Sequence, residues 1–224
     1  MFTRKTIKFL KELSEHNNRE WFSDNRQRYE DEVRTPALNY IESMTGPMAK
    51  ISPYFVVSAK KVGGSLMRVH KDIRFSKDKT PYKTNIGIQF RHARGKDVHA
   101  PGFYLHIEPG NAFVAVGIWR PESSTLKNVR SLIDEYPDEW KKLSNKLVKK
   151  SNFELSGTSL KRPPRGFDQE HPLLIDLKRK DFFAVQNLKV SDIYAKDFHL
   201  NSAKLFKAAS PLVQFICDAD DHLF

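Results

Sequence analysis

Residues 102–119, GFYLHIEPGNAFVAVGIW, predict two β-strands joined by a tight turn. Apolar and polar side chains alternate along the first half of this stretch, which is the period of a strand with one buried face. The turn residues Pro109-Gly110-Asn111 follow, and a second apolar run comes directly after them. The stretch therefore predicts a β-hairpin whose first strand turns three side chains to the core: Phe103, Leu105 and Ile107.

Two stretches upstream of this hairpin show the same alternation. In residues 66–72 the side predicted to be buried holds Met67 and Val69, and in residues 86–91 it holds three apolar side chains. Short links join these stretches, so we expect four consecutive strands in an antiparallel meander. Their predicted bounds are 66–72, 86–91, 103–108 and 113–119, and one more strand is predicted in DFFAVQNLKV, residues 181–190.

Helical patterns precede and follow the predicted strands. Apolar residues recur at helical spacing in the first sixteen residues. Asn17 suits the left-handed residue that ends this helix, and Asn18 suits the N-cap of the next one. A further helix is predicted to start at Thr35-Pro36, and the last helix to be interrupted at Pro211.

Because helices and strands are segregated along the chain, the predicted fold class is α+β. We expect a mainly antiparallel sheet with helices packed on one face, N-terminal helices preceding the strands and helices following them. The sequence contains no repeat and no flexible linker, so residues 1–224 are expected to form a single domain.

The composition indicates a folded protein and excludes several classes. Hydrophobic residues make up 39% of the 224 residues and aromatic residues 12%, which argues against disorder. No apolar run reaches the roughly 18 residues that span a bilayer, so no membrane partner is expected. The single cysteine, Cys217, lies in an apolar helical pattern and is predicted to pack in the core. A lone cysteine also suits a reducing compartment, so we expect a cytoplasmic protein.

Positive charge is concentrated in one segment of the sequence. The formal net charge is +11, which favours an anionic partner. Residues 58–96 hold eleven Lys and Arg against two Asp, a local net charge of +9. Scattered charge serves solubility, whereas concentrated charge favours binding, so we interpret this segment as a binding face.

The loop RFSKDKTPYK, residues 74–83, lies inside that segment, with Phe75 and Tyr82 as predicted anchors. A rigid loop loses little entropy on binding, so we predict that its cations bind a phosphate or a carboxylate. The alternative is a charge-rich hairpin in which Asp78 pairs with two lysines. The candidate anion-binding residues of the loop are Arg74, Lys77, Lys79 and Lys83.

The second side of the predicted sheet is polar, and two interpretations of it stay open. It is either solvated, as one face of an antiparallel sheet often is, or partly covered so that it forms a pocket. Side chains with directional hydrogen bonds favour the pocket. The residues of this polar side are Arg68, His70, Gln89, Arg91, Tyr104, His106 and Glu108.

We expect four of these residues to share one site beside the 74–83 loop: Arg68, His70, His106 and Glu108. If the protein is an enzyme, His70 or His106 is the candidate general acid–base, because imidazole titrates near neutral pH. Glu108 would orient Arg68 or raise the pKa of a neighbouring histidine. The candidate anion-binding residues on the strands are Arg68, Arg91 and Tyr104.

Motifs for other chemistry are weak or missing in the sequence. His106-x-Glu108 and His70 supply two imidazoles and a carboxylate, but no HExxH motif or cysteine pair accompanies them. The surrounding cations would also repel a divalent ion, so we expect no metal. The sequence has no G-x-G-x-x-G, P-loop or G-x-S-x-G motif, so no cofactor is predicted.

Five long motifs carry a resemblance to a known family. They are NNREWFSDNRQRYEDEV (17–33), RVHKDIRFSKDKTPYKTNIGIQF (68–90), GFYLHIEPG (102–110), GIWRPESSTLKNVRSLI (117–133) and LKRPPRGFDQEHPL (160–173). With these motifs the chain resembles the widespread uncharacterised family known as domain of unknown function 2461, from about residue 3 to near the C-terminus. The resemblance implies a single domain, and it brings no activity and no catalytic residues to this sequence.

The leading hypothesis is a domain that binds, or binds and processes, a phosphorylated or otherwise anionic small molecule at a basic face of the sheet. The alternative is a nucleic-acid-binding module that uses residues 58–96 on backbone phosphates. A third hypothesis is an interaction domain with no small-molecule site. The shape of the surface discriminates, because an enclosed basic patch favours a small anion and an open basic stripe favours nucleic acid.

Overall fold

The computed structural model describes residues 1–95 and 99–224, and within them the chain forms an α+β fold around a five-stranded antiparallel sheet. The strand order is β1-β2-β3-β5-β4. The bounds are β1 (Ile86–Arg91), β2 (Gly102–Glu108), β3 (Asn111–Ile118), β4 (Glu154–Ser156) and β5 (Phe182–Leu188). The hairpin predicted from residues 102–119 is confirmed, and Glu108 pairs with Asn111 across the turn.

The prediction of a strand at residues 66–72 is wrong. This segment makes only isolated bridges, which join Leu66 to Ile88 and His70 to Tyr82. Its backbone hydrogen bonds go first to β1 and then to residues 81–83, since the Met67 N–H donates to Gly87 and the Val69 carbonyl accepts from Lys83. A segment that changes partner within four residues cannot keep the regular ladder of a strand.

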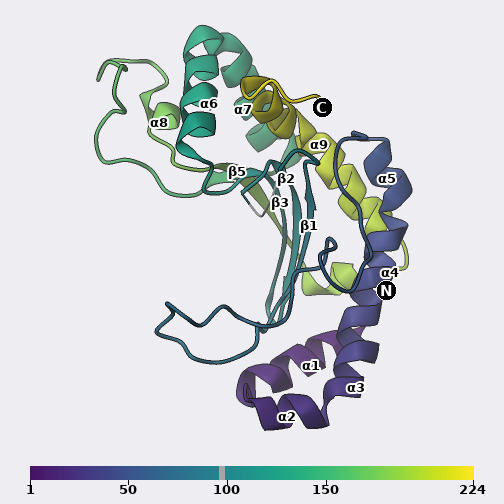
Figure 1. Cartoon of the computed structure of the whole chain (residues 1–224). Helices are drawn as coiled ribbons and strands as arrows, with labels where there is room; N and C mark the ends of the chain where they lie inside the picture. The colour runs from purple at the N-terminus through teal and green to yellow at the C-terminus, as the bar shows by residue number, and fades with distance from the viewer. Residues whose placement is uncertain (96–98) are drawn as a thin grey trace.

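Helices precede and follow the strands, as predicted from their segregation in the sequence. Figure 1 shows α4, α5 and α9 on one side of the sheet, while the loops before β1 and around α8 extend on the other side. A π-helical turn (Glu30–Arg34) joins α3 to α4, and a 3-10 turn (Val190–Tyr194) precedes α9. The helix bounds are α1 (Arg4–Glu15), α2 (Arg19–Asp24), α3 (Arg26–Tyr29), α4 (Thr35–Ser43), α5 (Thr45–Ala49), α6 (Ser123–Glu135), α7 (Pro137–Ser151), α8 (Leu174–Leu177) and α9 (Phe198–Ala219).

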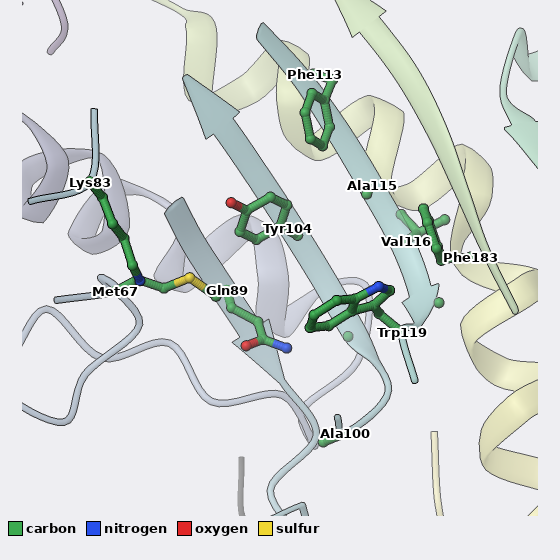
Figure 2. A pocket seen from close by; sticks show the side chains of 12 residues that line it. Met67, Lys83, Gln89, Ala100, Tyr104, Phe113, Ala115, Val116, Trp119 and Phe183 are labelled. Atoms are coloured by element: carbon green, nitrogen blue, oxygen red, sulfur yellow. The ribbon is translucent and has the colours of Figure 1, made fainter. Parts of the chain in front are cut away.

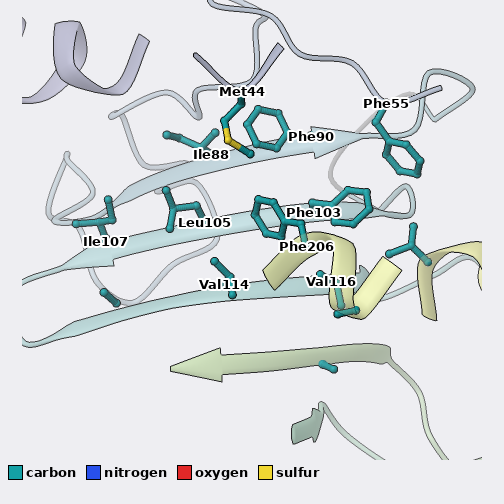
Figure 3. Packing of buried hydrophobic residues seen from close by; sticks show 14 of the residues in the cluster. Met44, Phe55, Ile88, Phe90, Phe103, Leu105, Ile107, Val114, Val116 and Phe206 are labelled. Carbon is teal, nitrogen blue, oxygen red and sulfur yellow. The ribbon is translucent and has the colours of Figure 1, made fainter. Parts of the chain in front are cut away.

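The core lies between the sheet and the helices that cover it. Figure 3 shows the inward side chains of β1, β2 and β3 meeting Met44 and Phe206, which come from the helical layer. The apolar residues predicted to face the core from β2 are fully buried, and so is Cys217 on α9. Burial raises the pKa of the Cys217 thiol to about 12, so this cysteine is a packing residue, as predicted.

The last helix is not interrupted at Pro211, contrary to the prediction. α9 runs without a break from Phe198 to Ala219. Proline has no N–H to donate to the carbonyl of Lys207, four residues earlier. The Ser210 hydroxyl donates to that carbonyl instead, at 3.0 Å, so the acceptor keeps a hydrogen bond.

Asn17 has a different role from the predicted one. α1 ends at Glu15 with His16 as its C-cap, and Asn17 is not among the described residues with positive φ. The N-cap predicted at Asn18 is confirmed, because its Oδ1 accepts from the Trp21 N–H at 2.9 Å. The Asn17 amide bonds the backbone of Tyr82, a residue 65 positions away.

Two hydrogen bonds and a ring contact form what we call the Asn17–Tyr82 pair. Asn17 Nδ2 donates to the Tyr82 carbonyl at 2.9 Å, and the Tyr82 N–H donates to Asn17 Oδ1 at 3.1 Å. The Tyr82 ring stacks on Phe22 of α2, with centroids 4.0 Å apart. The pair therefore ties the first helices to the residues that lead into β1.

We predict that Asn17→Ala lowers the free energy of unfolding by about 1–3 kcal/mol, because it leaves the N–H and the carbonyl of Tyr82 without partners. Urea denaturation measures the change. Asn145→Ala is the matched control, since Asn145 is exposed on α7 and its replacement should change stability by less than about 0.5 kcal/mol. Equal effects of the two substitutions would contradict a structural role for the Asn17–Tyr82 pair.

Candidate functional site

A pocket lies over the face of the sheet opposite the core. Its volume is about 460 Å³, which is within the range of small-molecule sites. Figure 2 shows its floor on β1, β2 and β3, with side chains rising from the strands and from the segments beside them. The lining residues are Met67, Lys83, Gln89, Ala100, Gly102, Tyr104, Phe113, Ala115, Val116, Gly117, Trp119 and Phe183.

Residue size on this face explains the hollow. Tyr104 pairs with Gln89 on one side and with Ala115 on the other, and Gly102 pairs with Gly117. Small residues at the centre keep the floor low, while aromatic side chains around it stand higher. Of the two open interpretations of this face, a solvated surface and a pocket, the structure has the pocket. Its lining is more aromatic and less charged than the sequence suggested.

Gly87 makes room for the hydroxyl of Tyr104. A Cβ atom at this position would lie 2.8 Å from Tyr104 Oη and 2.9 Å from the sulfur of Met67. Both distances are shorter than atoms at a real Cβ tolerate. The missing side chain therefore lets the hydroxyl reach across β1 toward Met67.

Lys83 brings a positive charge into the pocket. Its half-buried side chain extends beside Met67 in Figure 2, and none of the ion pairs among the described residues includes it. Burial lowers the pKa of its ammonium group, and the positive charge of Arg68 lowers it further. An ammonium group in this state is stabilised by any anion that enters the pocket.

Tyr104, His106 and Glu108 form a chain of hydrogen bonds along β2. The Tyr104 hydroxyl is 3.1 Å from His106 Nδ1, and His106 Nε2 is 3.4 Å from a Glu108 oxygen. The other carboxylate oxygen of Glu108 accepts from the Thr84 hydroxyl at 3.2 Å. We call these three β2 residues the Tyr104–His106–Glu108 chain.

The surroundings of His106 favour its neutral form. Its ring stacks on Phe113 with centroids 4.6 Å apart and planes at 9°. Burial lowers the pKa of the imidazole, and the hydrogen bond and negative charge of Glu108 oppose this effect. Burial also raises the pKa of the Tyr104 hydroxyl to about 12, so Tyr104 is protonated at neutral pH.

The four residues predicted to share one site are not brought together. His106 and Glu108 are joined, but the ring of His70 packs on Tyr82 and Phe22, at 5.1 Å and 6.4 Å between centroids. The rings of Tyr82 and Phe22 belong to the core on the helical side of the sheet. Arg68 and His70 are exposed, whereas Met67, which was expected in the core, lines the pocket.

The physical reason is the irregular backbone of residues 66–72. The alternation that assigned Arg68 and His70 to the polar face holds only in a regular strand, and this segment is not one. The catalytic role proposed for His70, and the anion-binding role proposed for Arg68, stay predictions.

Two of the four cations of the 74–83 loop, Arg74 and Lys79, make polar contacts with residues just before it, and Lys71 just before the loop pairs with Asp78 inside it. Arg74 is 2.6 Å from Asp72, and Lys71 is 2.7 Å from Asp78. The Lys79 ammonium donates to the Ile73 carbonyl at 2.9 Å. These contacts favour the charge-rich hairpin, although Asp78 pairs with one lysine and with Thr80 rather than with two lysines.

The Arg74 guanidinium lowers the pKa of Asp72 to about 2, and the Lys71 ammonium lowers the pKa of Asp78 as well. Lys77 takes part in none of the ion pairs formed by the described residues. Arg91 lies opposite Gly102 in the register of β1 and β2, at the rim of the pocket. Of the basic segment 58–96, Lys96 lies outside the described residues.

Sequence reasoning missed the walls of the pocket. Phe113, Trp119 and Phe183 come from β3, the residue after it, and β5, and only the pairing of these strands brings them together. A tryptophan at the last position of a predicted strand was the available signal. Within residues 1–95 and 99–224, no group of three or more His, Cys, Asp or Glu is arranged to hold a metal ion. No helix in this part of the chain is long and apolar enough to cross a bilayer.

We predict that the pKa of His106 lies below its ordinary value of about 6.5, and that Glu108→Gln lowers it further by removing the charge that favours the imidazolium. NMR titration of the imidazole nitrogens measures both values. The unfolded chain binds more protons at this residue, so stability from the neutral form is lost as pH falls below the ordinary pKa.

The exposed Glu170→Gln is the matched control for this titration and should leave it unchanged. A pKa of His106 at or above the ordinary value in the unmodified protein would contradict the buried environment.

Comparison with known proteins gives a family and no function. No curated protein and no solved structure matches the chain. A family model described as "conserved hypothetical protein (DUF2461)" matches residues 5–215, which is most of the sequence. The resemblance inferred from the motifs is thereby confirmed, and the chain belongs to the DUF2461 family of conserved hypothetical proteins.

Proposed function

We propose that the pocket binds a small organic anion that has a flat apolar body. The observation that carries this proposal is Lys83, a half-buried ammonium group in an otherwise mostly apolar pocket, with no ion-pair partner among the described residues. The hypothesis of an anionic small molecule at this face of the sheet is kept from the sequence. Of the candidate anion-binding residues, Lys83 and Tyr104 line the pocket, and the proposal now rests on them.

The anionic group is supported by electrostatics. A buried charge without a partner is unfavourable, and an anion that pairs with it removes part of that cost. Hydrogen bonds that involve a charged group contribute about 1.5–3 kcal/mol each, more than neutral ones do. A carboxylate or a phosphate of the ligand is therefore expected beside Lys83.

The apolar body is supported by the walls. Trp119 is 44% exposed and borders the pocket. Its position is fixed by its neighbours, since His99 stacks on it at 5.7 Å and the Arg120 guanidinium lies 4.5 Å from its ring centre. The backbone N–H of Arg120 donates to the buried carboxylate of Asp181 at 2.8 Å. A wall that is ordered before binding reduces the entropy cost of holding a flat ligand.

We predict that 2-naphthylacetate binds at least tenfold more tightly than neutral 2-naphthylacetamide, and that Lys83→Met removes this preference. Methionine keeps the apolar length of lysine and loses only the charge. Isothermal titration calorimetry measures the four affinities. Lys146→Met, an exposed position on α7, is the matched control and should keep the preference.

Equal binding of both compounds to the unmodified protein would contradict the role of Lys83. If neither compound binds, the third hypothesis, an interaction domain with no small-molecule site, is favoured over the pocket.

One observation favours a second candidate function, the binding of single-stranded nucleic acid by the 74–83 loop. Phe75 is 95% exposed, with the Arg74 guanidinium 5.8 Å from its ring centre. Lys77, two residues further on, has no ion pair within the described part of the chain. Exposed aromatic rings among cations stack on bases while the cations contact phosphates. This candidate places the partner on the loop rather than in the pocket.

If this second candidate is right, Phe75→Ala weakens the binding of oligothymidylate by about fivefold or more, because stacking contributes about 1–3 kcal/mol per base. Lys77→Met reduces the slope of log affinity against log salt by about 0.7. Fluorescence anisotropy over a salt series measures both, with Lys146→Met as the control. No binding at low salt removes the candidate.

A further inference from the structure

We infer that the Tyr104–His106–Glu108 chain fixes the Tyr104 oxygen as a hydrogen-bond acceptor in the pocket, so that the site selects anions with a hydroxyl or N–H donor near the charged group. This inference rests on the proposed function and narrows its ligand class. It follows from which atoms in the chain can donate, starting from the carboxylate.

The carboxylate of Glu108 sets the direction of the chain. A carboxylate has no proton to donate, so the His106 Nε2 that faces it, at 3.4 Å, must carry the hydrogen. In a neutral imidazole the other nitrogen, Nδ1, is then an acceptor. Burial lowers the pKa of the His106 imidazole, which favours this neutral form, and the ring stacks on Phe113.

Two polar groups lie within hydrogen-bonding distance of the acceptor, His106 Nδ1. The Tyr104 hydroxyl lies 3.1 Å from His106 Nδ1, and Asn85 Nδ2 lies 3.4 Å from the same nitrogen. An amide nitrogen only donates, so Asn85 is compatible with the same tautomer. His106 Nδ1 has one lone pair, and the Tyr104 hydroxyl is the nearer of its two donors, at 3.1 Å against 3.4 Å. The Tyr104 proton is therefore directed at His106, and the Tyr104 oxygen keeps its lone pairs for another partner.

The position of that oxygen places the partner in the pocket. Figure 2 shows the Tyr104 hydroxyl on the side of the ring that faces Lys83. Gly87 leaves the space that the hydroxyl occupies, since any Cβ there would meet it at 2.8 Å. The two polar groups on this side of the pocket therefore need different partners. Lys83 needs a negatively charged acceptor, and the Tyr104 oxygen needs a hydrogen-bond donor.

A ligand that satisfies both groups has a donor next to its anionic group. Hydroxy acids, amino acids and phosphate esters with a neighbouring hydroxyl have this arrangement, and an apolar ring attached to them would lie against Trp119 and Phe113. An ether oxygen in place of the hydroxyl would meet the Tyr104 oxygen acceptor to acceptor, which leaves both without a hydrogen bond.

The experiment uses three matched probes and the full chain. The probes are 2-naphthylacetate, its α-hydroxy derivative (2-naphthylglycolate) and the O-methyl ether of that derivative. The last two are chiral and are used as separated enantiomers. We expect the better enantiomer of the hydroxy acid to bind three- to tenfold more tightly than its methyl ether, the range of one neutral hydrogen bond. Calorimetry measures this ratio.

Two variants test the chain itself. Tyr104→Phe removes the acceptor and should bring the ratio to about one. Glu108→Gln should bring the hydroxyl-to-ether ratio within about twofold of one. A glutamine can donate to His106 Nε2, which permits the tautomer with its hydrogen on Nδ1, and Tyr104 then donates its own proton to the ligand. A purely structural role of Glu108 would lower all affinities together and leave the ratio unchanged. Glu170→Gln is the matched control.

The outcomes separate this inference from the proposed function. Lys83-dependent binding of 2-naphthylacetate with a hydroxyl-to-ether ratio of one overturns the inference and keeps the proposed function. A ratio that survives Tyr104→Phe with the fold intact also overturns it, because that variant has no Tyr104 oxygen to accept from the ligand. Failure of all three probes to bind overturns both.

Discussion

The Asn17–Tyr82 pair is the constraint on which the arrangement of the pocket depends. It holds the segment before β1 against the first helices, and Phe22 fixes the ring of Tyr82 on the core side. In an extended backbone successive side chains point to opposite faces. Once Tyr82 is buried on the helical side, Lys83 is therefore directed to the pocket side. The motif that begins at Asn17 and the loop before β1 therefore together determine where the Lys83 ammonium group lies.

The sheet separates two environments that need different residues. On the helical side, large apolar residues of β1, β2 and β3 are fully buried and provide the stability of the fold. On the other side, the small residues Gly102, Ala115 and Gly117 line the pocket, and Gly87 leaves room for the Tyr104 hydroxyl. The polar residues of that side are few and are ordered by each other, because Glu108 orients His106 and His106 orients Tyr104. This arrangement suits recognition of a small polar group in an apolar cavity.

The sequence predicted the parts of the structure that local periodicity determines. β1, β2, β3 and β5, the hairpin at Gly110 and the N-cap at Asn18 follow from alternation and turn residues, and all are confirmed. Residues 66–72 alternate equally well, but their hydrogen bonds divide between two partners, which no local pattern records. Pro211 is tolerated because Ser210 replaces its missing bond, a compensation visible only in three dimensions. For the candidate site, the sequence pointed to Tyr104 and Lys83, which line the pocket, and to His106 and Glu108, which are hydrogen-bonded to each other along β2, but their roles stay predictions. The aromatic walls depend on strand order, which sequence periodicity does not give.

The central claim is that the Lys83 ammonium group, which has no ion-pair partner within residues 1–95 and 99–224, is the group that pairs with an anionic ligand. The titration of Lys83 tests this claim most directly. NMR of protein labelled with ¹³C at the lysine side chains measures the pKa of Lys83 with and without saturating 2-naphthylacetate. The account predicts a pKa below the ordinary value of about 10.5 in the free protein and an increase when the anion is bound, with no change at Lys146. A pKa of Lys83 at the ordinary value, unaffected by the ligand, would contradict it.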